Sequence, residues 1–332
     1  MKENEIRPAE IFNRYLALSR EDIEKFFSDR RNFVEVNCPA CGSANQQPGL
    51  EKFDFVYVLC GECATLYVSP RPEPSQLDNY YRDAQAIKFW STHFYKQTVD
   101  ARREKMFRPR AKLVAEILDQ YTHREPSIFV DVGCGYGVFL DEVRRLKLFK
   151  QLIGIEPNAD LADVSAQRGF SIIRKVIEDV SKGEVQADFA TAFEVLEHVF
   201  DPLKFLRAIR QILKPGGIVL FTTLTVSGFD IQLLWEQSKS VYPPHHINLI
   251  SVEGMQRLVE RAGFQIIDLA TPGELDVDIV SNMIKEDPSL RLPRFVSGLL
   301  RDERSKREFQ DFLRRNKLSS HIRVIAAAGD WA

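Results

Sequence analysis

The segment 127–137, with the sequence SIFVDVGCGYG, constrains the fold more than any other part of this chain. Its first half, Ile128–Val132, is apolar except for Asp131 and reads as a short strand buried in a parallel sheet. A glycine-rich turn follows, and then a predicted amphipathic helix that places Phe139, Val143 and Leu146 on one face. A strand that leads through a glycine turn into a helix is typical of nucleotide-binding α/β folds.

The glycines at 133, 135 and 137 let the backbone approach a ligand closely, and the following helix offers unpaired N–H groups. Glu156 ends the next apolar run, Leu152–Ile155, about where such folds place the carboxylate that binds a ribose. Position 138 is Val, so the last glycine of the dinucleotide pattern G-x-G-x-x-G is missing. The pattern D-x-G-x-G-x-G instead resembles the first motif of class I methyltransferases that use S-adenosylmethionine. On this loop alone, a protein that binds another nucleotide and a turn with a purely structural role remain the alternatives to that interpretation.

Four of the five cysteines form two C-x-x-C pairs, Cys38 with Cys41 and Cys60 with Cys63. This spacing predicts a structural zinc site with four thiolate ligands. Disulfides are disfavoured in a reducing compartment, and a redox pair would not need two copies. The fifth cysteine, Cys134, lies inside the glycine turn, where we expect a small packing residue rather than a nucleophile.

The bulk properties of the 332 residues fit one large or two modest domains with a substantial core. The formal net charge of −2 provides no global basic field for a polyanionic partner. The first residues lack the apolar core of a signal peptide, and no apolar run approaches the ~20 residues of a membrane span. We therefore expect a soluble, cytoplasmic protein.

The first 75 residues are predicted to hold helices and a zinc module. Helical periodicity runs from residue 9, and Ser19 to Asp22 resembles a capping box that opens a second, short helix ending at 27. Between the cysteine pairs, Phe53–Leu59 reads as a strand with Thr65–Val68 as its partner, which suits a zinc ribbon of two hairpins.

Strands and helices alternate after a helical region at 76–122. The strands are expected at 128–132, 151–155, 171–176, 188–193 and 218–223, with two more at 263–269 and 321–328. Their apolar character favours a parallel sheet covered on both faces. Residues 272–318 are helical and charged, which indicates an insertion or cap.

Four motifs occur in order: DVGCGYG at 131–137, IEP at 155–157, FEVLEHV at 193–199 and LKPGG at 213–217. Over roughly residues 105–270 this order resembles class I methyltransferases that use S-adenosylmethionine (SAM). The resemblance implies a Rossmann-like α/β fold with a seven-stranded sheet whose last strand is antiparallel. The expected domains are a helical extension at 1–32, a zinc ribbon at 33–75, a SAM-binding domain at 76–271, a helical insertion at 272–318 and the last strand at 319–332.

The resemblance also assigns cofactor contacts. The three glycines would flank the methionine part of SAM, and Glu156 would accept hydrogen bonds from the ribose hydroxyls. Val176 occupies the usual place of an adenine-binding carboxylate, so the Ile177 backbone would hold the adenine, with Glu178 as the fallback. The candidate cofactor residues are Asp131, Gly133, Cys134, Gly135, Tyr136, Gly137, Glu156, Ile177, Glu178 and Glu194. We expect LKPGG to be a structural turn.

An exposed histidine pair is predicted at the acceptor side of the site. The segment 242–251, YPPHHINLIS, places His245 and His246 in a Pro-rich loop at the sheet edge where ligands sit. It looks like the Y-x-E-H-x-x-Y-F-S motif of nucleotide-sugar C-methyltransferases, in which the histidine after the glutamate acts as base. That position is His246 here, and His245 replaces the glutamate. Those enzymes also carry an N-terminal cysteine-rich zinc module.

A methyltransferase of this kind needs in-line positioning of the acceptor and removal of one proton. Histidine titrates near neutrality and suits that proton, so His246, His245 and His198 are the candidate catalytic residues. Alternatively, these rings only shape the pocket. His93, His123 and His321 are expected to have no role.

The function expected is SAM-dependent methyl transfer (EC 2.1.1.-) to a small molecule, a nucleotide-linked sugar of polysaccharide or secondary metabolism. One alternative is an RNA methyltransferase that grips nucleic acid with the zinc ribbon. Between the cysteine pairs, however, only Lys52 is basic, against Glu51 and Asp54, which disfavours a nucleic-acid partner. A SAM-binding protein without turnover is the third possibility. Carbon versus oxygen methylation and the oligomeric state stay open.

Overall fold

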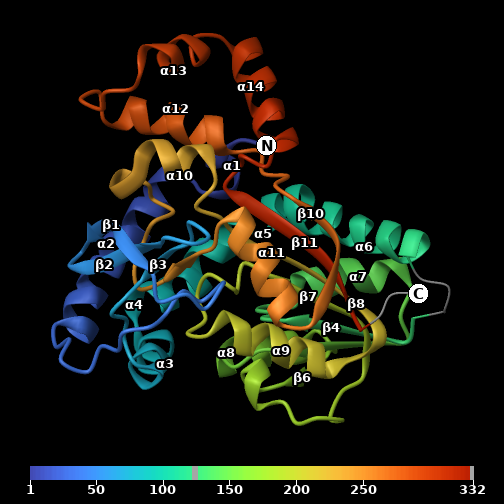
Figure 1. Ribbon diagram of the computed structural model, residues 1–332. Coiled ribbons are helices and arrows are strands. Elements are labelled where there is room, and N and C mark those ends of the chain that lie inside the picture. Colours follow the sequence, from blue (N-terminus) through green and yellow to red (C-terminus); the bar gives the residue numbers. More distant parts are fainter. Residues whose placement is uncertain (122–125, 330–332) are drawn as a thin grey trace.

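A seven-stranded sheet forms the centre of the protein in the computed structural model, which describes residues 1–121 and 126–329 (Figure 1). The strand order is β10 (Phe264–Ala270), β11 (His321–Ala328), β8 (Leu213–Leu224), β7 (Ala187–Phe193), β4 (Ile128–Val132), β5 (Gln151–Ile155) and β6 (Ser171–Ile173). β11 is antiparallel to both of its neighbours, and the pairs from β8 to β6 are parallel. This confirms the seven-stranded sheet with an antiparallel last strand.

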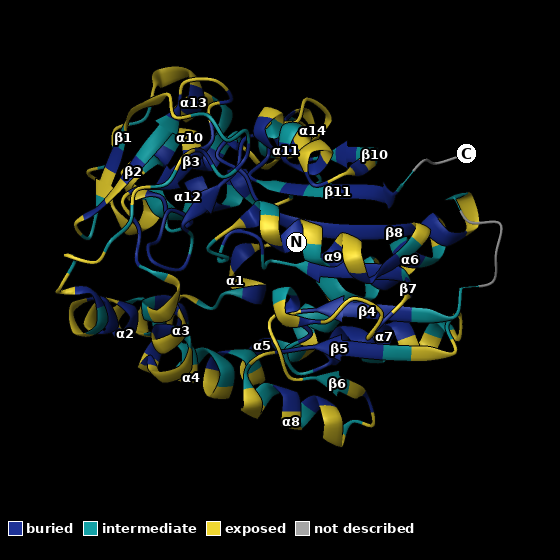
Figure 2. Cartoon of the chain, turned by 60° about the horizontal axis from the view of Figure 1, so that its bottom comes forward, coloured by how far each residue is buried: buried dark blue, intermediate teal, exposed yellow. Residues whose placement is uncertain are grey.

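Helices cover both faces of this sheet because its strands are apolar on both sides. Phe129 packs with α6 (Arg108–Tyr121) and α7 (Val138–Leu146), while the next residue, Val130, packs with α9 (Pro202–Ile212) and α11 (Val252–Arg261). α8 (Ala159–Gln167) lies beside β5 and β6. Most residues of the inner strands β4, β7, β8 and β11 are buried, and exposure is concentrated on the outer sides of the helices (Figure 2).

Three strands of the predicted zinc module and one strand from the segment with the histidine pair form a second, four-stranded sheet. Its order is β1 (Gln46–Lys52), β2 (Phe55–Cys60), β3 (Leu66–Val68) and β9 (Asn248–Leu249), with antiparallel pairs throughout. β1 was not anticipated because its sequence, QQPGLEK, is polar and interrupted by a bulge between Pro48 and Leu50. β9 belongs to the segment with the histidine pair, so the methyltransferase part of the chain completes this sheet.

The N-terminal region corrects the prediction of two helices. After the short α1 (Glu3–Ile6), α2 runs unbroken from Ala9 to Phe27, and Ser19 is buried inside it. The Asp22 carboxylate instead accepts hydrogen bonds from the Gln85 and Ala86 amides, at 3.0 and 2.7 Å. Asp22, which the sequence predicted as part of a capping box, therefore accepts hydrogen bonds from the unpaired amides in the first turn of α4. The nearer of these amides is 63 residues away along the chain.

The remaining helices surround the ends of the strands. α3 (Pro74–Asp83), α4 (Gln85–Phe89) and α5 (Tyr95–Arg102) precede α6, with π-helical turns at Trp90–Phe94 and Arg103–Phe107. α10 (Phe229–Leu234) lies under the insertion, which consists of α12 (Asp276–Glu286), α13 (Arg294–Leu299) and α14 (Glu303–Arg315) (Figure 1). The terminal amino group and Lys2 form ion pairs with Glu274 and Asp278, at 3.3 Å each, so the N-terminus is bound to the insertion.

Two strand boundaries in the seven-stranded sheet differ from the prediction by more than one residue. β6 ends at Ile173, and β8 begins at Leu213, so LKPGG is the start of a strand rather than a turn before it. Lys214 in this stretch pairs with Asp188 at 2.7 Å, away from the carboxyl ends of the strands. His123 lies outside the described residues.

Candidate functional site

A cavity of about 1160 Å³ lies at the carboxyl ends of the parallel strands. Its walls include the ends of β4, β5, β7 and β8, the helices that precede α6, and the first residue of the insertion helix α12. Ligand pockets of enzymes commonly measure about 300–1,000 Å³, so this cavity has room for a nucleotide-sized ligand and a second small molecule.

Gly133 and Gly135 of the glycine turn line this cavity, whereas Gly137 does not. Gly133, Gly135 and Gly137 have φ values of 73°, 53° and 70°, a region that favours glycine. A Cβ on Gly133 would meet Val195 at 2.8 Å, and one on Gly137 would meet the Ser165 hydroxyl at 2.9 Å. A Cβ on Gly135 would meet no protein atom within 4 Å. Gly135 therefore borders open space that a ligand can occupy.

Glu156 joins the end of β5 to this turn. Its carboxylate accepts hydrogen bonds from the Gly135 and Asn158 amides, each at 2.9 Å. The side chain lines the cavity although the residue is only 6% exposed, and burial raises its pKa. The carboxylate is therefore oriented toward the space beside the glycine turn, as ribose recognition requires.

The other candidate residues of the turn also line the cavity. Asp131 accepts a hydrogen bond from the Thr191 hydroxyl at 2.7 Å, and burial raises its pKa to about 7. Cys134 is buried against Gly154, and burial raises the pKa of its thiol, as a packing role implies. The Tyr136 hydroxyl donates to the Ser91 carbonyl.

The proposed adenine contacts lie in the short 3₁₀ turn Ile177–Asp179 that follows β6. Ile177 is buried and Glu178 is half-buried, and both line the cavity together with the more exposed Val176. Burial raises the pKa of Glu178. The structure thus brings both adenine candidates to the same cavity as the glycine turn.

Glu194, at the end of β7, is the centre of a charged cluster. Its Oε1 accepts hydrogen bonds from Arg110 and the Thr222 hydroxyl, each at 2.7 Å, and lies 2.8 Å from Nε2 of His321. Burial opposes ionisation, but His321 and Arg110 hold the pKa of Glu194 well below its usual range. Its φ of 55° is unusual for a residue with a side chain.

His321 lines the cavity, although the sequence analysis expected it to have no role. It is the first residue of β11. Because β11 runs antiparallel to the other strands, its beginning lies at the edge where they end. The predicted antiparallel last strand was therefore the signal that could have placed His321 at the site.

The structure buries His245, in contrast to the predicted exposed pair. The residue is 4% exposed, and its Nε2 lies 2.6 Å from the Tyr80 hydroxyl and 3.0 Å from that of Tyr15. These tyrosines come from α3 and α2, so the sequence near the histidine contained no sign of them. Burial lowers the pKa of His245 well below its usual range.

His198 and His246 have the same hydrogen-bond arrangement at the cavity wall. Nδ1 of His198 lies 2.7 Å from the His245 carbonyl, and Nδ1 of His246 lies 2.6 Å from the Ser240 carbonyl. A carbonyl only accepts, so both Nδ1 atoms carry the proton and both Nε2 atoms keep a lone pair. Burial lowers the pKa of His198, and burial with the nearby His198 lowers that of His246 to about 3.

Glu197 lies next to these two rings. It is 2% exposed and accepts a hydrogen bond from the Thr223 hydroxyl at 2.7 Å. Burial, reinforced by the charge of Glu194, raises its pKa to about 8.

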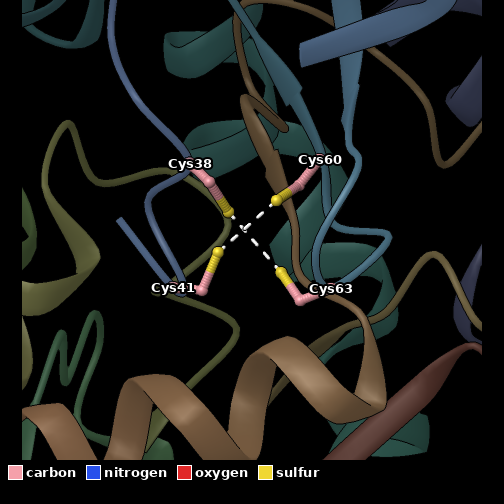
Figure 3. Close-up of side chains that lie close together, drawn as sticks. All are labelled: Cys38, Cys41, Cys60 and Cys63. Carbon is pink, nitrogen blue, oxygen red and sulfur yellow. Dashed lines mark hydrogen bonds between the residues drawn. The ribbon is translucent and has the colours of Figure 1, made fainter. Parts of the chain in front are cut away.

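The four sulfur atoms of the predicted zinc site point toward one centre (Figure 3). The Cys38 and Cys63 sulfurs are 3.6 Å apart, those of Cys41 and Cys60 are 3.4 Å apart, and no two of the four are separated by more than 4.8 Å. Ligands at the usual Zn–S distance of about 2.3 Å would be ~3.8 Å apart in a tetrahedron. No disulfide joins them, and a hydrogen bond from Cys38 lowers the pKa of Cys63 to about 4. The donor set therefore fits zinc.

The zinc module supports the histidine segment directly. The Tyr57 hydroxyl donates to the His246 carbonyl at 2.7 Å, and the Val68 amide donates to the Ile247 carbonyl at 3.0 Å. The Ser251 hydroxyl donates to the carbonyl of Cys63 itself. The position of His246 thus depends on the fold of the zinc module.

Within residues 1–121 and 126–329, no helix is long and apolar enough to cross a membrane.

Comparison with known proteins identifies a methyltransferase domain in the chain. A family model described as "Methyltransferase domain" matches residues 102–269. Ubiquinone biosynthesis O-methyltransferase of Ruegeria pomeroyi is 30% identical over 156 residues, which cover 41% of this chain and 62% of that protein. The chain therefore spans less than two thirds of this relative. The Salmonella typhimurium enzyme of the same name is 31% identical over 189 residues, which cover 54% of this chain and 72% of that protein.

A solved structure agrees in fold. The plantazolicin methyltransferase BpumL, in complex with a monoazolic desmethylPZN analog and SAH, superposes with a TM-score of 0.50. The match covers 76% of this chain and 94% of that one at 12% identity.

Proposed function

Since this chain belongs to the methyltransferase domain family, we propose that it transfers the methyl group of SAM to a small-molecule acceptor bound in the 1160 Å³ cavity. The observation that carries the proposal is the open space beside Gly135, bordered by the oriented Glu156 carboxylate. When bound, SAM supplies an activated methyl group. Glu156 would hold the ribose, the turn at 133–137 the methionine part, and Ile177 with Glu178 the adenine.

The cavity continues from Glu194 toward His198 and His246, and this part would hold the acceptor. Tyr15, Trp90 and Tyr242 add aromatic surface to its wall. Aromatic rings bury the apolar face of a ring-shaped ligand while nearby polar atoms orient its hydroxyls. This composition supports a hydroxylated ring as acceptor, and we propose methyl transfer to one of its oxygens.

A nucleotide-linked sugar is the acceptor that we propose to test first. Support comes from the likeness of segment 242–251 to the sugar-methyltransferase motif and from the pairing of β9 in that segment with β3 of the zinc module. The same pairing disfavours RNA binding, because one edge of the ribbon sheet is occupied. The cysteine cluster also packs into the main core with α11.

Replacing His246 with alanine should leave SAM affinity unchanged and reduce methyl transfer by about 10²–10⁴-fold, the usual contribution of a group that assists proton removal. The measurement is release of S-adenosylhomocysteine with a panel of nucleotide sugars and short RNAs, beside calorimetry with SAM. His93→Ala is the matched control, because His93 is an exposed histidine outside the cavity. Full activity of the His246 variant would exclude a role for this ring at the acceptor.

A further inference from the structure

A cluster of three potential metal ligands lies on the acceptor side of the cavity. One ligand atom each of Glu197, His198 and His246 lies within 4.8 Å of the other two. All three residues line the cavity. Glu197 and His198 follow β7, whereas His246 precedes β9, so the fold joins two distant segments here.

Both imidazoles are oriented as metal ligands usually are. Each donates its Nδ1 proton to a backbone carbonyl, His198 to that of His245 and His246 to that of Ser240. In metal-bound histidines, the ring nitrogen that does not bind the metal usually donates such a hydrogen bond, which fixes the tautomer and the orientation of the ring. Nε2 is then the free ligand atom of each ring, and the described residues form no hydrogen bond to it. The two ring centres are 5.1 Å apart.

The carboxylate of Glu197 completes the set. Thr223 holds one of its oxygens at 2.7 Å. Among the described residues, no lysine or arginine forms an ion pair with Glu197, whereas neighbouring Glu194 has both Arg110 and His321. Placing a carboxylate in a protein interior is costly unless a cation compensates its charge. A cation bound between Glu197 and the two rings would supply that compensation.

We propose that Glu197, His198 and His246 bind a divalent transition-metal ion, a second metal site distinct from the cysteine cluster. Two imidazole nitrogens and one carboxylate oxygen suit first-row ions such as Fe²⁺, Co²⁺ or Zn²⁺ and leave coordination positions open. The four thiolates of the ribbon form a closed set, while this site faces the acceptor space. The inference rests on the proposed function, because it gives those open positions to an acceptor hydroxyl.

The chemistry needs no strongly basic side chain. A divalent ion lowers the pKa of an oxygen ligand, so the acceptor hydroxyl releases its proton to solvent water on binding. The oxygen then forms a bond to the methyl carbon while the carbon–sulfur bond breaks, and S-adenosylhomocysteine leaves. His246 acts here as a ligand and not as the proton acceptor, which agrees with the hydrogen bond that fixes its Nδ1 on the Ser240 carbonyl.

The test is a cobalt titration of the full-length protein with zinc already bound to the ribbon. We expect one Co²⁺ per chain, with visible absorption bands of nitrogen and oxygen ligation and no thiolate-to-cobalt band. His246→Ala and Glu197→Gln should each weaken Co²⁺ binding at least about tenfold, since even outer contacts to metal ligands contribute 10–100-fold. Glu197→Gln conserves the side-chain volume. His93→Ala, with unchanged binding, is the control, and circular dichroism with a thermal melt shows that each variant is folded.

The outcomes separate this inference from the proposed function. Absence of a cobalt site in the wild-type protein, or a site unaffected by both substitutions, overturns the metal assignment even if methyl transfer is found. Cobalt binding that is lost in both variants supports it, even if SAM does not bind. In the latter case the methyltransferase proposal fails while the metal site stands.

Discussion

Cys60→Ser is expected to release the ribbon zinc and unfold the four-stranded sheet. Structural zinc sites contribute on the order of 10 kcal/mol in small modules, more than the net stability of most domains. The four-stranded sheet has few other sources of stability, because β3 contains only three residues and β1 is polar and bulged. Metal analysis of the wild-type protein should give one zinc per chain that chelators of moderate strength do not remove, and the variant should have none at this site.

Unfolding of the four-stranded sheet should also disorder the wall of the cavity that contains His246. β3, Tyr57 and the Cys63 carbonyl all contact the segment 242–251, so that segment loses its support when the module unfolds. Hydrogen exchange should therefore increase at residues 242–251 as well as at 34–71. Cys134→Ala is the matched control, because this buried cysteine lies outside the cluster. Unchanged zinc content and exchange in Cys60→Ser would refute the structural role.

Glu156→Ala should weaken SAM binding by about 10²–10⁴-fold, since hydrogen bonds to a charged group contribute about 1.5–3 kcal/mol each and two ribose hydroxyls would lose their acceptor. The substitution also removes the acceptor of the Gly135 and Asn158 amides, so the turn becomes less ordered. Isothermal calorimetry with SAM and with S-adenosylhomocysteine measures the effect.

Two further variants sharpen this experiment. Glu156→Gln keeps the shape of the side chain and should bind SAM with intermediate affinity. Glu178→Ala, at the adenine end, should have a much smaller effect because the half-buried Glu178 is only one of several groups there. If Glu156→Ala binds SAM as tightly as the wild-type protein, the ribose assignment is wrong.

Local sequence patterns predicted most of the fold because their physical causes are local. The mostly apolar run Ile128–Val132 has the length and composition of a strand buried in a sheet, and the glycines after it permit the positive φ angles that the turn requires. The spacing of the cysteines predicted the sulfur cluster for the same reason, since each C-x-x-C pair forms its own tight turn.

Contacts between segments that are distant in the sequence account for the predictions that were wrong. Asp22 looked like part of a helix start in its own segment, but it caps α4. His245 looked exposed, yet Tyr15 and Tyr80 from other helices bury it. His321 looked like an ordinary strand residue, and only its position opposite Glu194 makes it part of the site.

The sequence by itself determined the SAM-binding end of this protein, where the turn, its glycines and Glu156 follow one another closely along the chain. Tertiary structure alone decided the acceptor end. There, Glu197 and His198 meet His246 because a strand of the zinc module pairs with β9 and holds that segment against the sheet. The physical reason is that backbone geometry is encoded by neighbours in sequence, whereas the partners of a buried polar group are supplied by whatever the fold packs against it.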